Sequence, residues 1–237
     1  MFFSKLDYNQ FIPHIQNINR TEGDILLIDK PYHLTSFEVV NKIKIALKKT
    51  FPDNIKVGHA GTLDPLATGL LIICTGRKTK IIEQIQAMEK EYTGTFFLGA
   101  TTPCFDKEKE IDFTFPTEHI TETLILDTAK KFMGKQMQTP PAYSAVRIEG
   151  KRAYDLAREG IVEIKTTPKE INILQFEITN ISLPEIDFKV VCSKGTYIRS
   201  LARDFGLALN SGAYLTSLRR TRTGDYNVSN AIVPIIR

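Results

Sequence analysis

The sequence predicts an α+β fold in which at least part of the sheet is antiparallel. Segments with strand and helix character interleave irregularly along the 237 residues, without internal repeats or low-complexity tracts. Residues 170–183 and 186–192 alternate as two strands around Pro184, a pattern typical of a tight antiparallel hairpin. These features favour an α+β fold over a doubly wound parallel sheet.

The first part of the chain predicts an arm followed by alternating strands and helices. Residues 1–22 are polar and aperiodic, so we interpret them as an N-terminal arm without chemistry. Thr35 and Glu38 resemble a capping box, and apolar residues then recur on one helical face, which predicts a helix over 36–49. The other expected elements are strands at 24–28, 56–57 and 70–74 and a helix over 78–87.

The second part begins with β-forming residues that predict a strand starting at or near Tyr92. Prolines and charges over 100–118 predict a loop. Helices are expected over 122–133 and 150–160, and a third follows from apolar residues spaced between Ile198 and Ala208. Tyr197 and Arg199 therefore lie at a strand-to-helix junction, which makes them candidate site residues.

Composition limits the class of protein. A hydrophobic fraction of 42% and a charged fraction of 24% are typical of soluble globular proteins. The longest apolar run, Leu70–Cys74, has five residues, whereas a membrane helix needs about 20. The N-terminus lacks the pattern of a secretory signal, so we expect a cytoplasmic protein without membrane contact.

The cysteines and histidines give no indication of a metal centre. Cys74, Cys104 and Cys192 are an odd number without a CxxC pair, and the four histidines lack metal-ligand spacing. We expect neither a disulfide framework nor a metal, and we expect reduced cysteines, with Cys74 and Cys192 buried.

One carboxylate, Asp64, lies in a turn whose composition restricts the backbone. Gly58 and Gly61 permit close approach or positive φ, and Pro65 favours an extended conformation for Asp64. Taken alone, this pattern also fits an ordinary tight turn capped by an aspartate.

The stretch GHAGTLDPLATGLL, from Gly58 to Leu71, resembles the catalytic motif of the TruB family of tRNA pseudouridine synthases. Other segments resemble family blocks in family order, and together they cover about nine-tenths of the chain: IDKP with Thr35-Ser36, KEY leading to Leu98-Gly99, PPAYSA, CSKGTYIR and LRRTRTG. The resemblance implies a pseudouridine synthase fold over residues 23–237, with a large mixed, mostly antiparallel sheet, flanking helices and a central RNA-binding cleft.

The resemblance also implies an isomerase that converts a T-loop uridine of tRNA, at position 55, into pseudouridine. The glycosidic bond breaks, the uracil rotates and a C–C bond forms, so no atom is gained or lost and no cofactor or metal is needed. The target base must first be flipped out of its stack. The expected partner is the T arm of tRNA, and the protein is expected to be a monomer.

By resemblance, Asp64 is the catalytic carboxylate, acting either as nucleophile or as base. A carboxylate in a dry pocket needs a fixed positive partner to stay charged, and Arg199 is the candidate. Tyr92 resembles the tyrosine that stacks on the target uracil. The expected substrate-binding residues are His59, Tyr197 and Leu218, which resemble base-contacting or space-filling residues, and Lys30, Arg219 and Arg220, which are phosphate or scaffold contacts.

The sequence departs from the family pattern at three places. His33 replaces a common glycine, which puts the shape of that turn in doubt, and the segment Thr102–Asp106 lacks the first of two acids, so it receives no role. The chain ends thirteen residues after Gly224, so we expect no C-terminal PUA domain.

Charge is unevenly placed along the chain, whose net charge is +4. Between Lys194 and Gly224, six cationic side chains face a single acid, Asp204, which predicts either an RNA-binding face or an ordinary solvated surface. Two other functions are considered. One is an RNA chaperone without chemistry, but a protein that only binds RNA has no reason to keep a buried acid. The other is a glycosidase-like hydrolase, but that reaction would need paired carboxylates.

Overall fold

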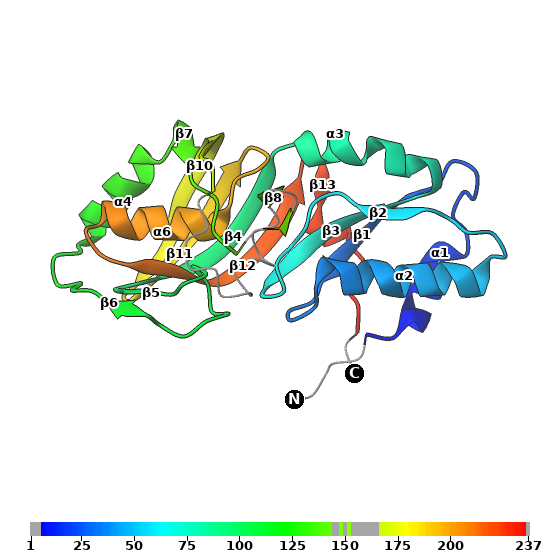
Figure 1. Cartoon of the computed structure of the whole chain (residues 1–237), viewed down its shortest axis with the longest axis horizontal. Helices are drawn as coiled ribbons and strands as arrows, with labels where there is room; N and C mark the ends of the chain where they lie inside the picture. Colours follow the sequence, from blue (N-terminus) through cyan, green and yellow to red (C-terminus); the bar gives the residue numbers. More distant parts are fainter. Residues whose placement is uncertain (1–5, 144–146, 149–150, 153–165, 236–237) are drawn as a thin grey trace. The chain divides into compact units, whose positions relative to one another are not determined.

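The computed structural model describes residues 6–143, 147–148, 151–152 and 166–235 (Figure 1). The chain divides into two compact units, Met1–Tyr92 with Arg219–Arg237 and Thr93–Leu218. Strands β4 (Lys90–Leu98) and β12 (Ala213–Thr223) contribute residues to both units.

In the first unit, β1 (Ile25–Lys30) and β3 (Ala67–Thr75) form an antiparallel pair with Ile28 opposite Leu71. β2 (Val57–His59) pairs with β3, and β13 (Tyr226–Asn227) pairs with the end of β12. The remaining elements are η2 (Gly76–Ile81), α3 (Ile82–Ala87) and η3 (Val228–Asn230). Nearly all of β3 is buried, which explains its continuous apolar sequence.

Helix α2 (Ser36–Thr50) begins where the sequence predicts. The Thr35 hydroxyl accepts a hydrogen bond from the Glu38 backbone, and the Glu38 carboxylate accepts one from the Thr35 backbone. This capping box satisfies two N–H groups that a helix leaves unpaired at its start. The apolar face of the helix, including Val39 and Ile43, is buried.

The N-terminal residues differ from the expected aperiodic arm. They form η1 (Tyr8–Phe11) and α1 (Ile12–Ile15), and both elements contact α2. Phe11, Ile15 and Ile18 are buried and follow the i, i+4, i+7 spacing of a helical face. The polar residues between them conceal that spacing in the sequence.

The second unit contains strands in the order β12, β4, β11 (Glu185–Cys192), β10 (Lys169–Ser182) and β7 (Gly134–Gln138). β10 and β11 form the predicted antiparallel hairpin, with Ser182 opposite Glu185. The expected loop over 100–118 contains a short pair, β5 (Ala100–Thr101) with β6 (Phe113–Thr114). β8 (Arg147–Ile148) pairs with β9 (Lys151–Arg152), so residues 151–152 of the helix predicted over 150–160 form a strand instead, and residues 153–160 of that prediction lie outside the described residues.

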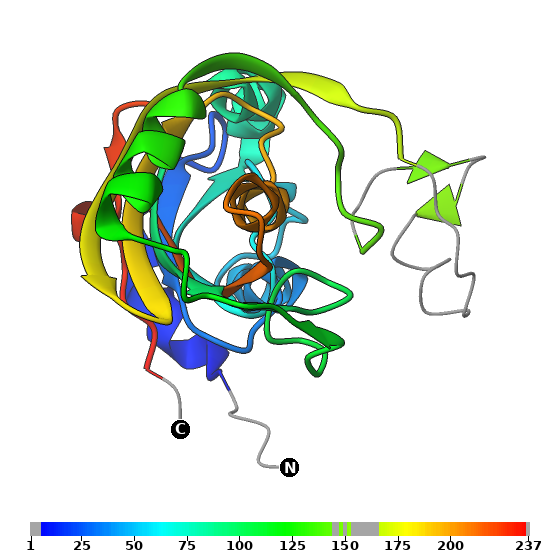
Figure 2. The same cartoon turned by 90° about the vertical axis from the view of Figure 1, so that its left-hand side faces the viewer.

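A phenylalanine cluster joins the sheet of the second unit to α4 (Glu122–Lys131) and α6 (Ile198–Ala208), which lie beside its strands in Figure 2. Phe205 of α6 lies 5.6 Å from Phe176 and 5.7 Å from Phe96, and Phe132 after α4 lies 5.8 Å from Phe205, between ring centroids. These rings supply much of the buried apolar surface that fixes α6 and its N-terminal residues.

The predicted α+β class with a large, mostly antiparallel sheet is confirmed. The single catalytic domain over 23–237 and the central RNA-binding cleft stay predictions. Within the described residues, no helix has both the length and the apolar character needed to span a membrane.

Candidate active site

Asp64 lies in the loop between β2 and β3, and this loop is fixed to the sheet at both ends. On one side the Ala60 N–H donates to the Ile72 carbonyl at 2.8 Å, and on the other the Ala67 N–H donates to the Asp64 carbonyl at 3.0 Å. Gly61 has a φ of 108°, a conformation that residues with a side chain rarely adopt. The Asp64 side chain is half-buried.

The first residue of α2 holds the loop next to Asp64. The Ser36 hydroxyl accepts a hydrogen bond from the Leu63 N–H at 2.9 Å and donates to the Leu63 carbonyl at 3.1 Å. Ser36 and Leu63 are both buried. One side chain therefore satisfies both backbone groups of the residue before the candidate catalytic carboxylate.

Lys30 reaches the other side of Asp64 from the end of β1. It is fully buried, and its Nζ donates to the carbonyls of Leu34 at 2.6 Å, Pro31 at 2.9 Å and Pro65 at 3.4 Å. Burial lowers the pKa of Lys30 from 10.5 to about 8, although the charges of Asp64 and Glu38 oppose this effect. These contacts favour the scaffold role over a phosphate contact.

Arg220 of β12 is a third support of the same loop. Its side chain is 1% exposed, and its guanidinium donates to the Leu70 carbonyl at 2.7 Å and the Gly61 carbonyl at 3.1 Å. A buried guanidinium that is used in this way is not presented to a phosphate in solvent. The geometry therefore favours a scaffold role for Arg220 as well.

Two histidines in this unit differ in what they contribute. The buried Nδ1 of His59 has no hydrogen-bond partner of good geometry in the described part of the chain. Burial lowers the pKa of His59, and the backbone of Gly61 offsets this only in part, so the ring is neutral at pH 7. His33 has a φ of 66°, so the turn keeps a glycine-like backbone despite the substitution.

In the second unit, Arg199 lies in the first turn of α6 and is buried. Its Nε lies 3.6 Å from Oδ2 of Asp106, and its other nitrogens donate to the carbonyls of Cys104 at 3.3 Å and Tyr143 at 2.8 Å. The Asp106 side chain is equally buried. Asp106, which received no role from the sequence, is therefore the acidic partner of the candidate residue Arg199.

Tyr197 is the N-cap of α6, as its predicted junction position requires. The side-chain amide of Gln138 accepts from the Tyr197 N–H at 2.8 Å and donates to the Tyr197 carbonyl at 3.1 Å. Gln138 is a second residue that sequence reasoning missed. Leu218 lies in β12 and Tyr92 in β4, and both side chains are partly exposed.

The units therefore divide the predicted site residues between them. Lys30, His59, Asp64, Tyr92, Arg219 and Arg220 belong to the first, while Tyr197, Arg199 and Leu218 belong to the second. The predicted pairing of Asp64 with Arg199 joins residues of different units and stays a prediction.

The basic segment from Lys194 to Gly224 is largely neutralised by internal partners. Arg219 binds Asp29 through two hydrogen bonds of 2.9 and 2.6 Å, Arg222 lies 2.8 Å from Glu89, and Arg203 lies 2.7 Å from Asp204. Arg199 and Arg220 are buried, as described above. Of the six cations, only Lys194 has no such partner in the described residues, so most of this segment is not a free basic face.

Comparison with known proteins agrees with this fold and identifies the family. The model of the TruB family pseudouridylate synthase N-terminal domain matches residues 48–198. The tRNA pseudouridine synthase B of Flavobacterium johnsoniae is 60% identical over 213 residues, which cover 89% of this chain and 93% of that protein. That of Phocaeicola vulgatus is 55% identical and covers 91% and 92%.

Among solved structures, a Cbf5–Nop10–Gar1 complex matches with a TM-score of 0.67 and 27% identity, covering 97% of this chain and 56% of that one. An H/ACA RNP bound to a substrate RNA containing 2′-deoxyuridine matches with a TM-score of 0.64 and 27% identity, covering 93% and 52%. The chain thus spans about half the length of these structural neighbours.

Fold and sequence together define an isomerase of the pseudouridine synthase class. The chain belongs to the TruB family of pseudouridylate synthases.

Proposed function

We propose that this protein isomerises the uridine at position 55, in the T loop of tRNA, to pseudouridine. The observation that carries the proposal is the fixed position of Asp64, whose loop is held through Ser36, Lys30 and Arg220. A turn that only reverses the chain does not need three buried polar side chains on its backbone. The name shared by the bacterial relatives, tRNA pseudouridine synthase B, supports tRNA as the substrate.

In the proposed reaction, the bond between uracil N1 and ribose C1′ breaks, the uracil turns, and C5 bonds to C1′. The hydrogen on C5 leaves as a proton and N1 gains one, so atoms and electrons balance. Asp64 supplies the anionic group, either as a nucleophile at the sugar or as a base in an elimination. The preorganised loop keeps this carboxylate in position during the rotation.

The second unit supplies the proposed positive partner of Asp64. Asp106 and two backbone carbonyls fix the Arg199 guanidinium, which stays charged at any physiological pH. Arg199 would offer the Asp64 carboxylate a fixed positive charge that can hold it with two hydrogen bonds. Arg199 and Asp64 therefore act as a pair in this proposal, with Asp106 as a positioning residue.

Recognition of the flipped uridine is assigned to residues around this pair. Tyr92 stacks on the uracil, a contact worth about 1 to 3 kcal/mol, and Tyr197 and Leu218 complete the base pocket. His59 fills the space that the base leaves, and as a neutral ring it adds no charge there. The protein is proposed to act as a cytoplasmic monomer on the T arm.

The test is tritium release from an unmodified tRNA transcript that carries [5-³H]uridine, because C5 loses its hydrogen only when it bonds to C1′. We expect release of one equivalent of tritium, which vanishes when cytidine replaces uridine 55. Binding without release would support the chaperone alternative and would refute the proposal.

Arg199→Lys should slow release at least tenfold with little effect on RNA affinity, because lysine cannot hold the carboxylate with two bonds.

A further inference from the structure

A basic cavity lies beside α2 in the first unit, outside the residues assigned to chemistry. Its volume is about 440 Å³, and its polar lining consists of Lys44, Lys48, Asn54, Lys56 and Thr79. Leu47, Ile55, Val57 and Gly58 complete the wall. No acidic side chain lines the cavity.

The three lysines have no visible structural task. Each is exposed, and within the described ranges none of their amino groups has a hydrogen-bond or ion-pair partner. Lys44 and Lys48 are four residues apart on α2, where like charges destabilise a helix by about 0.2 to 0.5 kcal/mol. The helix dipole accounts for Lys48 in the last turn, but not for Lys44 or for Lys56, which lies outside the helix.

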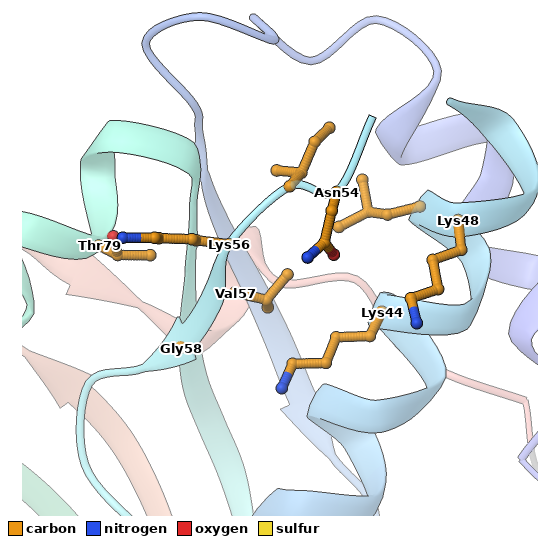
Figure 3. A pocket seen from close by; sticks show the side chains of 9 residues that line it. Lys44, Lys48, Asn54, Lys56, Val57, Gly58 and Thr79 are labelled. Atoms are coloured by element: carbon orange, nitrogen blue, oxygen red, sulfur yellow. The ribbon is translucent and has the colours of Figure 1, made fainter. Parts of the chain in front are cut away.

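The arrangement of the charges fits an extended anion better than a compact one. Figure 3 shows Lys44 and Lys48 directed from α2 to the side of Asn54 and Val57, whereas Lys56 extends away from them toward Thr79. The three amino groups therefore do not converge on one point, as they would around a single phosphate. Lysines act as point charges without the bidentate geometry of arginine, which suits successive phosphates of a nucleic-acid strand.

The position of the cavity relates it to the Asp64 loop. Val57 and Gly58 form part of its wall, and both belong to β2, the strand that leads directly into the loop that carries Asp64. The basic segment from Lys194 to Gly224 is largely neutralised internally, so it leaves few charges for the RNA backbone. The unpaired lysines of the cavity supply the free positive charges for the RNA backbone that this segment lacks.

We propose that Lys44, Lys48 and Lys56 form a phosphate-binding track for the sugar-phosphate backbone of the RNA substrate. This inference rests on the proposed function, because it takes RNA as the ligand. The track adds affinity and salt dependence and takes no part in chemistry. It carries no base specificity, since phosphate contacts position a nucleic acid without reading its sequence.

The experiment compares the triple variant K44Q/K48Q/K56Q with a matched control, K49Q/K131Q/K169Q, which removes three exposed lysines that do not line the cavity. Dissociation constants for unmodified tRNA are measured from 50 to 300 mM NaCl, together with kcat and KM for tritium release. The cavity variant should lose roughly 0.7 to 0.9 units of log-log salt slope per lost phosphate contact, so about 2 in total. Its KM should rise at least tenfold at low salt, with kcat unchanged.

A salt slope and KM equal to those of the control would overturn the proposal. Loss of inorganic phosphate binding without any change in the RNA slope would also overturn it, since the cavity would then hold a small anion. Reduced RNA affinity in the cavity variant supports the track even if the wild-type protein releases no tritium, a result that would refute only the proposed function. Equal thermal unfolding of both variants and the wild-type protein excludes a folding defect.

Discussion

Ser36→Ala tests whether the backbone around Asp64 is held for catalysis. The substitution removes one hydroxyl, leaves α2 with a good helix former at its first position, and leaves the Leu63 N–H and carbonyl without their partner. A buried polar group left unsatisfied costs about 1 to 3 kcal/mol. We therefore expect a loss of about 2 to 3 kcal/mol in unfolding free energy, or roughly 4 to 12 °C in Tm for a chain of this size.

The effect on activity should be larger than the effect on binding. Misplacement of a reacting group by about 1 Å can cost about a hundredfold in rate, so kcat for tritium release should fall by about 10- to 100-fold with RNA affinity nearly unchanged. The matched control is Ser211→Ala, which removes a buried hydroxyl that donates to the Pro116 carbonyl in the other unit. A Ser36→Ala protein with wild-type kcat would refute the argument that this clamp positions Asp64.

Two other predictions concern buried charges. Asp106→Asn should lower kcat at least tenfold while KM changes little, because Arg199 loses its acidic partner. The control is Asp112→Asn, which changes an exposed aspartate. Equal rates for the two variants would contradict the role of Asp106 in positioning Arg199. Burial lowers the pKa of Lys30 to about 8, so from pH 8 to 10.5 the unfolded chain binds more protons at this residue and stability rises with pH. The unfolding free energy of wild type relative to Lys30→Met should therefore rise by about 3 kcal/mol over that interval, as measured by urea unfolding; a constant difference would contradict the pKa.

Element boundaries that depend on a few adjacent residues were predictable from the sequence. The capping box of Thr35 and Glu38 places the start of α2, and Pro184 places the hairpin between β10 and β11. The junction before α6 also follows from local spacing, with Tyr197 as the N-cap. In each case the determining interaction lies within a few residues of the element that it fixes.

Interactions between distant residues were not predictable in this way. Arg219 is separated from its partner Asp29 by 190 residues, and Arg220 from the Leu70 carbonyl by 150. The sequence shows only a basic run at this point, because the acids and carbonyls that neutralise it lie in other elements. Strand β12 was not predicted either. Its arginines indicate an exposed segment, because arginine is rarely buried unless it is paired, and the partners that pair it here lie in other elements.

The residues that support the site were missed because they lack any motif of their own. Gln138 fixes Tyr197 across 59 residues of sequence, and Asp106 reaches Arg199 from a loop that departs from the family pattern. The resemblance identifies the groups proposed to touch the substrate. The structure adds the side chains that hold those groups in place.

The central claim, that Asp64 is the catalytic carboxylate, is tested most directly by Asp64→Asn. The amide is nearly isosteric but can act neither as a nucleophile nor as a strong base. Single-turnover tritium release from the tRNA transcript should fall to background, while the dissociation constant for the same RNA stays within about threefold of wild type. Wild-type-like release by Asp64→Asn would contradict the account.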